Sequence, residues 1–275
     1  MKEKAIVVTG ASGFIGGEAA NRFDRMGWRV VRPSRDRFDL AGFVDPALFE
    51  NVDVVLHAEY GATGNLRGTR LLAAAARAAG ARSIFLSSFA AHPDALSLYG
   101  REKYIAESFF DIDKDTVLRP GLVLGPGGLF GRLVGYLRRS RIVPLIDGGR
   151  QPLQTIHICD LIDIIDRVAT SGTLPGQYNL AEPAPVAYRE FVAIVARQLG
   201  RNPWFVGVPS AVLGPLLQIS QALGIHLPVS EENLLGLKTL RARETNEDAR
   251  RIGVEIRPLA ESVKDLARVF DPSSD

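Results

Sequence analysis

Short apolar runs alternate with segments of helical periodicity along the first half of the chain. The first run, Ala5–Val8, is uniformly apolar, which is typical of a strand buried on both faces of a parallel sheet. Apolar residues at the spacing of one helix face follow it: Ile15, Ala19, Phe23 and Met26. Further apolar runs and helical patterns continue the alternation at 28–32, 52–58, 66–79 and 83–86. The pattern predicts stacked βαβ units around a parallel sheet.

Three glycines, Gly10, Gly13 and Gly16, lie between the first predicted strand and the first predicted helix. A strand that turns directly into a helix aims free backbone N–H groups and the positive end of the helix dipole at one point, which suits an anion. Glycine lets the backbone approach a pyrophosphate where a Cβ would hold it away. A tight turn without a ligand is the alternative. The G-x-x-G-x-x-G spacing differs from the ordinary G-x-G-x-x-G dinucleotide fingerprint, so the glycines alone leave both alternatives open.

Composition adds few constraints. The 275 residues are 46% hydrophobic and 23% charged, with a formal net charge of +2, which suits one large globular domain or a domain with a smaller lobe. Such a near-balance of charge gives no indication of a nucleic-acid partner. Cys159 is the single cysteine, so no internal disulfide and no metal site are expected. No secretory signal precedes the first strand, so a cytoplasmic location is expected.

One long segment, 202–230, carries no formal charge if His226 is neutral. Pro209, Pro215 and Pro228 interrupt it too often for a membrane-spanning helix, so no membrane span is predicted. We interpret the segment as a buried helix and loops of a second lobe. A surface that meets a lipid or another apolar ligand is the alternative.

Tyr99 and Lys103 lie four residues apart in a segment of helical pattern, so they share one face of the helix. A phenol is a poor acid or base near pH 7, because its reference pKa is about 10. A neighbouring ammonium, together with an oxidised nicotinamide, stabilises the phenolate and lowers that pKa. The pair therefore suits proton transfer at a carbonyl or alcohol oxygen, although most pairs at this spacing are solvated helix faces.

Several motifs follow one another in a fixed order along the chain: Thr9-Gly10-Ala11-Ser12-Gly13-Phe14-Ile15-Gly16, Ser87-Ser88, Tyr99-Gly100-Arg101-Glu102-Lys103, Arg119-Pro120-Gly121 and Gln154-Thr155-Ile156-His157. Together they resemble the extended short-chain dehydrogenase/reductase family, the NAD-dependent epimerases and dehydratases, over most of the chain. The resemblance implies an α/β fold, a Rossmann-type doubly wound parallel sheet with a smaller C-terminal substrate lobe. It predicts an NAD(P)-binding domain at 1–172, with 125–150 contributing to the substrate site, and a mainly substrate-binding lobe at 173–275.

The resemblance also assigns site residues. Ser88, Tyr99 and Lys103 are the expected catalytic residues, with Ser88 bonding the reacting oxygen beside Tyr99. The expected cofactor contacts are Gly10, Ser12, Gly13, Phe14, Ile15, Gly16, Ser34, Arg35, Asp39, Leu40, His57, Ala58, Glu59, Ser87, Tyr99, Lys103, Pro120, Leu122 and Val123. His57 is expected to be structural and not catalytic.

The expected cofactor is NADP, with NAD as the alternative. Ser34 stands where the family usually has the Asp that accepts from the 2′-OH of NAD, and Arg35 follows it. An arginine suits the 2′-phosphate of NADP. Asp36 or Asp39 would still allow NAD.

The implied activity is hydride transfer at a carbonyl or secondary alcohol, by an epimerase or a ketoreductase, on a small molecule such as a nucleotide sugar. Phe89 and Ala90 replace the two acidic residues that follow the catalytic hydroxyl in the family's dehydratases, so dehydration is disfavoured. His92 is a candidate extra acid or base, or a solvated loop residue. Arg241 and Arg243 are placed like the family's phosphate-binding residues. A homodimer is implied, and a non-catalytic dinucleotide sensor or assembly protein is the alternative function.

Overall fold

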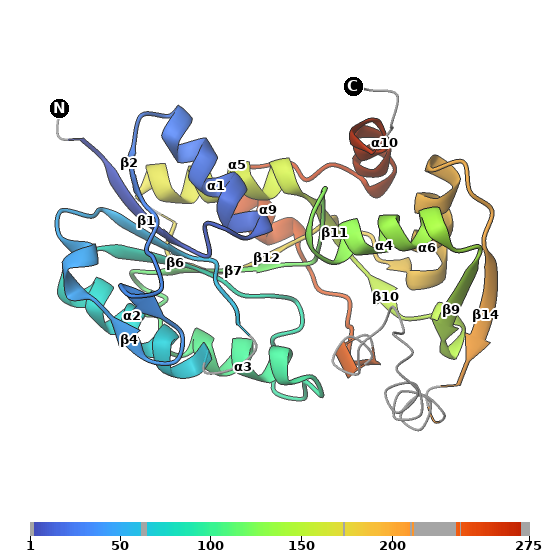
Figure 1. The fold of residues 1–275 in the computed structure, drawn as a ribbon, viewed down its shortest axis with the longest axis horizontal. Coiled ribbons are helices and arrows are strands. Elements are labelled where there is room, and N and C mark those ends of the chain that lie inside the picture. Colours follow the sequence, from blue (N-terminus) through green and yellow to red (C-terminus); the bar gives the residue numbers. More distant parts are fainter. Residues whose placement is uncertain are drawn as a thin grey trace.

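A six-stranded parallel sheet forms the centre of the protein in the computed structural model (Figure 1). The structure describes residues 3–61, 65–172, 174–209, 211, 235–236 and 238–270. The order across the sheet is β12-β7-β6-β5-β1-β2. These strands are β1 (Ala5–Thr9), β2 (Arg29–Val31), β5 (Val54–His57), β6 (Arg82–Leu86), β7 (Thr116–Pro120) and β12 (Gly176–Leu180).

Helices cover both faces of this sheet (Figure 1). They are α1 (Phe14–Arg25), α5 (Ile158–Ser171) and α9 (Asn246–Ile252) on one face, and α2 (Asn65–Ala78) and α3 (Leu98–Glu107) on the other. Successive residues of a strand point to opposite faces. Ile6 and Val8 therefore pack in the core under α1 and α5, whereas Val7 packs in the core under α2. The predicted doubly wound α/β fold is confirmed.

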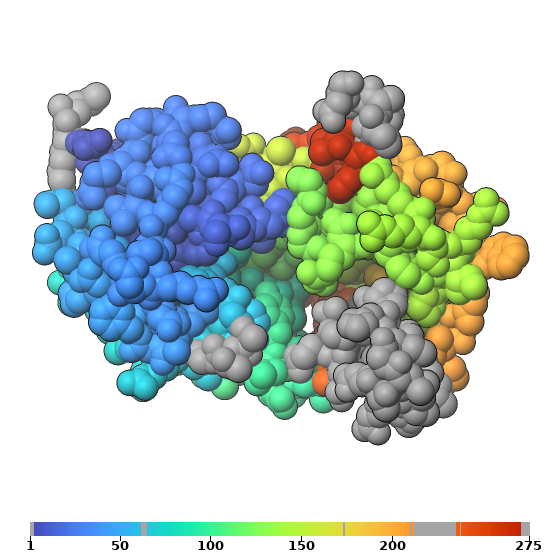
Figure 2. Space-filling model, in the orientation of Figure 1, coloured from blue at the N-terminus to red at the C-terminus, as the bar shows by residue number. Residues whose placement is uncertain are grey.

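A second core lies beside the sheet, among α4 (Gly128–Arg139), α6 (Tyr188–Gln198) and α10 (Leu259–Val269). Figure 2 shows the N-terminal segments (blue) and the segment around α4 (green) on opposite sides of one face. The remaining elements are short: β3 (Phe38–Asp39), β4 (Phe43–Val44), β8 (Leu122–Leu124), β9 (Ile142–Ile146), β10 (Pro152–Leu153), β11 (Thr155–His157), β13 (Val186–Ala187), β14 (Trp204–Val208) and the 3₁₀ turns Pro46–Phe49 and Asp147–Gly149.

The chain crosses between the two parts more than once. Beyond residue 172 it returns to the sheet, because β12 is the outer strand and α9 packs against it. Conversely, α4 lies before residue 172 and packs in the second core. The division into domains at residue 172 stays a prediction.

The uncharged segment 202–230 is described only at 202–209 and 211, and the rest lies outside the described residues. Its described part includes β14, which pairs in parallel with β9 and leaves the Trp204 side chain 71% exposed. This part is therefore an exposed strand, not the buried helix or loop expected. No helix in the described part of the chain is long and apolar enough to cross a membrane.

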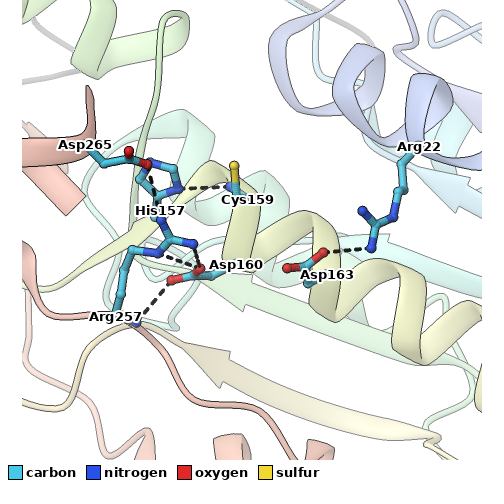
Figure 3. A network of polar contacts seen from close by, with 7 residues as sticks. All are labelled: Arg22, His157, Cys159, Asp160, Asp163, Arg257 and Asp265. Atoms are coloured by element: carbon cyan, nitrogen blue, oxygen red, sulfur yellow. Dashed lines mark hydrogen bonds and ion pairs between the residues drawn. The ribbon is translucent and has the colours of Figure 1, made fainter. Parts of the chain in front are cut away.

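An ionic network ties α10 to the start of α5 (Figure 3). Arg257 donates to Asp160 from Nε at 2.8 Å and from its backbone N–H at 3.1 Å, and its guanidinium also lies 3.3 Å from Asp265. His157 accepts the Cys159 N–H through Nδ1 at 3.2 Å and so caps α5. Burial and the Arg257 charge lower the pKa of His157, so the imidazole is neutral at pH 7. The network fixes the second core against the sheet.

We expect Asp160→Asn to lower the free energy of unfolding by about 2 kcal/mol, because charged hydrogen bonds that are mostly out of water are lost. The matched control is Asp163→Asn on the same helix. Asp163 pairs with Arg22 at 2.9 Å but is 57% exposed, so this change costs less than about 1 kcal/mol. Urea unfolding followed by circular dichroism measures both. Equal losses in the two variants would contradict the assignment.

Candidate active site

The glycine turn joins β1 to α1 by close backbone packing. Gly10 has φ +71°, and a Cβ on it would lie 2.9 Å from the backbone nitrogen of Glu59. A Cβ on Gly16 would collide with the carbonyl oxygen of Gly10. Gly13 is the N-cap of α1 and has no side chain with which to bond the first N–H groups of the helix. The turn therefore offers free backbone N–H groups, which suit an anion such as a pyrophosphate.

The residues around these glycines connect the turn to the second core. Ser12 and Gly13 are exposed, while Ile15 packs against the core beside the sheet. The ring of Phe14 lies against the start of α4, where a Cβ on Gly127 would be 2.7 Å from its Cγ. The 125–128 glycines therefore let α4 approach the turn.

The end of β2 presents Ser34, Arg35 and Asp36, all exposed. A hydrogen bond from the Ser34 hydroxyl lowers the pKa of Asp36. Asp39 is exposed and accepts the Ala41 N–H at 3.0 Å, while Leu40 is buried. This edge can hold the adenosine end of a dinucleotide.

Glu59 adds a carboxylate between these two regions. Burial raises the pKa of Glu59. The Gly10 N–H, which bonds the carboxylate, and the Arg35 charge lower this pKa, whereas the Asp39 charge raises it. The predicted cofactor residue thus brings a partly buried acid to the turn, next to Ala58, whose N–H bonds Thr9. The spacing along the chain gave no indication that the side chain faces the turn.

The side chain of His57 lies in the interior between β1 and α2. Its ring is fully buried and bonded on both nitrogens, to Thr9 Oγ1 at 2.7 Å and to Thr69 Oγ1 at 2.9 Å. Burial and the nearby Lys103 charge lower its pKa to about 3. The imidazole is therefore neutral and locks β1, β5 and α2 together.

Tyr99 and Lys103 lie one turn apart on α3, which Ser97 caps by accepting the Gly100 N–H at 3.1 Å. Lys103 is 5% exposed and donates to the Leu86 carbonyl at 2.7 Å. Burial lowers its pKa to about 7, against the opposing effects of Glu107 and Glu102. Burial also raises the pKa of Tyr99, and a hydrogen bond with Ser88 opposes that rise. The three predicted catalytic side chains are therefore brought together.

The segment that carries Ser88 is pinned to the neighbouring strand. Ser87 N–H donates to Leu118 O at 2.7 Å, and Phe89 N–H donates to Pro120 O at 3.0 Å. Pro120 is buried, and β8 continues from it with Leu122 and Val123 partly buried in a pair with β11. Of the predicted cofactor residues Pro120, Leu122 and Val123, Pro120 is therefore the one bonded to the residue that follows Ser88.

A buried acid behind Ser88 escaped the sequence analysis. Glu107 accepts the Ser87 hydroxyl, Arg119 Nε at 2.7 Å and Gln177 Nε2 at 3.1 Å. It lies one helical turn after Lys103, which is the one signal the sequence offered. The Ser87 side chain is thus engaged in the interior and anchors the serine segment.

The C-terminal part of the chain reaches the site through Arg243. Its guanidinium donates to Phe89 O at 3.0 Å and Ala91 O at 2.9 Å, and its backbone N–H donates to Gln154 Oε1 at 2.7 Å. Arg241, by contrast, pairs with exposed Asp94 at 3.0 Å. Of these two predicted phosphate ligands, Arg243 is the one bonded to the loop that follows Ser88.

His92 is not a solvated loop residue, because it is 7% exposed. Burial lowers its pKa, and the Arg241 and Arg243 charges lower it further. The imidazole is therefore neutral at pH 7. The sequence alternative of a solvated side chain is wrong because residues 239–243 pack over the loop.

The residues of the site fit a dinucleotide and a carbonyl substrate at one edge of the sheet. The sequence from residue 6 to residue 181 matches the NAD dependent epimerase/dehydratase family. A comparison with curated protein sequences gave no match.

Solved structures share the fold at low sequence identity. The chain is similar to dTDP-4-dehydrorhamnose reductase from Bacillus anthracis in complex with NADP (TM-score 0.74, 12% identity, 98% of this chain and 100% of that one). It is also similar to UDP-N-acetylglucosamine 4-epimerase from Bacillus cereus (0.70, 14%, 98% and 96%). A human epimerase family protein with NADPH is a third example (0.72, 20%, 96% and 99%). With a family match over residues 6–181 and the fold in agreement, the chain belongs to the NAD dependent epimerase/dehydratase family, which depends on NAD(P).

Proposed function

We propose that the protein is an NAD(P)-dependent oxidoreductase or epimerase that transfers a hydride at a carbonyl or secondary alcohol of a nucleotide-sugar-like substrate. One observation carries the proposal: buried Lys103 shares a helix face with Tyr99, and Tyr99 bonds Ser88. This group lies at the carboxyl end of β6, the edge of the sheet at which β1 enters the glycine turn. In open α/β sheets this edge binds the ligand.

The nicotinamide, when bound, supplies or accepts the hydride. The Tyr99 hydroxyl donates a proton to the substrate oxygen in reduction, or accepts one in oxidation. Ser88 holds that oxygen through a second hydrogen bond, and Lys103 stabilises the phenolate form of Tyr99. Gly10, Gly13 and the first turn of α1 would hold the pyrophosphate.

We propose NADP as the preferred cofactor, with Arg35 binding its 2′-phosphate. The side chain is exposed at the end of β2, where a 2′-phosphate would meet it. Glu59 and Asp39 lie nearby and would accept from the ribose hydroxyls of NAD. Two of the similar structures contain NADP or NADPH and another contains NAD, so the preference rests on Arg35.

Reduction or epimerisation is favoured over dehydration. Phe89 is buried and apolar and stands next to Ser88, with Ala90 after it. Neither side chain can remove a proton from carbon. A preference for NADPH would favour reduction, because a reductase exchanges its cofactor whereas an epimerase keeps it.

We expect Tyr99→Phe to lower kcat by about 10²–10⁴-fold, because the proton donor is lost. Turnover of NADPH with a panel of 4-keto nucleotide sugars and simpler ketones measures this. The affinity for NADPH should stay within about threefold of the wild-type value. The control is Tyr104→Phe, an exposed tyrosine on the same helix, which leaves turnover unchanged.

Full activity in Tyr99→Phe would refute the assignment of the acid. NADPH binding with no turnover of any carbonyl by the wild type would favour the non-catalytic sensor or assembly protein.

We expect Arg35→Ala to weaken NADPH binding by about 10- to 100-fold, the loss of a charge-assisted contact. NADH binding should change little. Titration calorimetry on cofactor-stripped protein measures both. Arg29→Ala is the control, because Arg29 begins the same strand and donates to the carbonyl of Asn51 at 2.8 Å, at the opposite edge of the sheet. An equal loss of affinity for NADH would show that Arg35 does not bind the 2′-phosphate.

A further inference from the structure

Tyr60 lies against the catalytic pair although it belongs to neither the predicted catalytic set nor the predicted cofactor set. It stands in the loop that leaves β5 toward α2. Its ring meets the ring of Tyr99 edge to face, with centroids 4.7 Å apart and planes at 85°. The same ring lies 5.6 Å from Nζ of Lys103. The Tyr60 ring thus lies next to both Tyr99 and Lys103 of α3.

A polar clamp fixes Tyr60 in this place. Its hydroxyl donates to Glu102 Oε2 at 3.0 Å, and Asn65 donates to the same oxygen at 2.7 Å. The Asn65 amide also bonds Gly61 twice, accepting its N–H at 2.7 Å and donating to its carbonyl at 3.0 Å. The loop and α3 are therefore joined through one carboxylate next to Lys103 in the sequence.

Two aromatic rings lie near the Lys103 ammonium. The Phe85 ring centroid lies 4.7 Å from Nζ, and the Tyr60 ring centroid lies 5.6 Å from it. An aromatic face attracts an ammonium, and its bulk excludes water.

The groups that face this ammonium are few. Glu102 and Glu107 of its own helix act on its charge, and the Leu86 carbonyl of β6 accepts from it. The Lys103 charge also lowers the pKa of His57 of β5, which is neutral at pH 7. Tyr60 is 36% exposed, whereas Lys103 is 5% exposed.

We propose that Tyr60 is a positioning residue that orients the Tyr99 ring and closes Lys103 off from water. The inference deepens the proposed function and rests on it for the turnover readout. Its other readout, the titration of Lys103, depends on neither substrate nor cofactor.

The test compares Tyr60→Ala with Tyr60→Phe in the ligand-free protein. Side-chain NMR signals of the lysines are followed with pH, and Lys103 is assigned from Lys103→Arg. In the wild type it should titrate at about 7. In Tyr60→Ala water reaches the ammonium, so its pKa should rise toward the ordinary value of 10.5. Loss of the ring attraction acts the other way, but burial is the largest cause of the lowered pKa of Lys103.

Tyr60→Phe keeps the ring and should titrate like the wild type. Tyr60→Ser replaces Tyr60→Ala should the latter not fold, with the same expected result. Tyr104→Ala, on the same helix, is the control and leaves the titration unchanged. An unshifted Lys103 in Tyr60→Ala would overturn the proposal.

Turnover gives the second readout. At pH 6.5 we expect kcat to fall by about 10- to 100-fold in Tyr60→Ala, because the hydroxyl of Tyr99 is misplaced, and to stay within about threefold in Tyr60→Phe. Wild-type kcat in Tyr60→Ala would overturn the orienting role. A wild-type protein without turnover refutes the proposed function, whereas the lysine titration still decides the inference.

Discussion

The burial of one cation organises the site. An ammonium that leaves water is stable only where other groups replace its hydration. For Lys103 the Leu86 carbonyl supplies a hydrogen bond, two aromatic rings supply their faces, and Glu107 supplies opposite charge. Glu107 in turn is held by Arg119, so the compensation extends from α3 into β7. The arrangement keeps the phenol of Tyr99 beside the Lys103 ammonium, which loses its proton near pH 7.

The same contacts explain how catalytic and cofactor regions share one rigid frame. His57, buried and neutral, bonds the end of β1 to α2, and its ring stacks on Phe85, which faces Lys103. A displacement of the glycine turn would therefore also displace Lys103, because packed side chains connect the two. Rigid elements of this kind hold a reacting pair more reliably than loops do.

The local features of the site were predictable from the sequence. The glycine turn and the Tyr99–Lys103 pair depend on residues close together in the chain, and periodicity alone places them on a strand end and a helix face. Two other features could not be predicted: the burial of His92, and the position of the Glu59 carboxylate next to Gly10. Segments far apart in the sequence create the surroundings of both side chains. Glu107 shows the limit: its spacing from Lys103 was visible, but its partners on β7 and β12 required the sheet order. The exposed strand at 204–208 depends likewise on its pairing with β9.

The contacts of Arg243 bear on how the protein is made. The arginine bonds the carbonyls that follow Ser88, and α9 behind it packs on the last strand of the sheet. A ribosome releases the N-terminal strands long before this segment, so the dinucleotide turn can form early while the serine loop still lacks its anchor. Completion of the proposed catalytic pocket therefore waits for a residue that is synthesised after every strand of the central sheet.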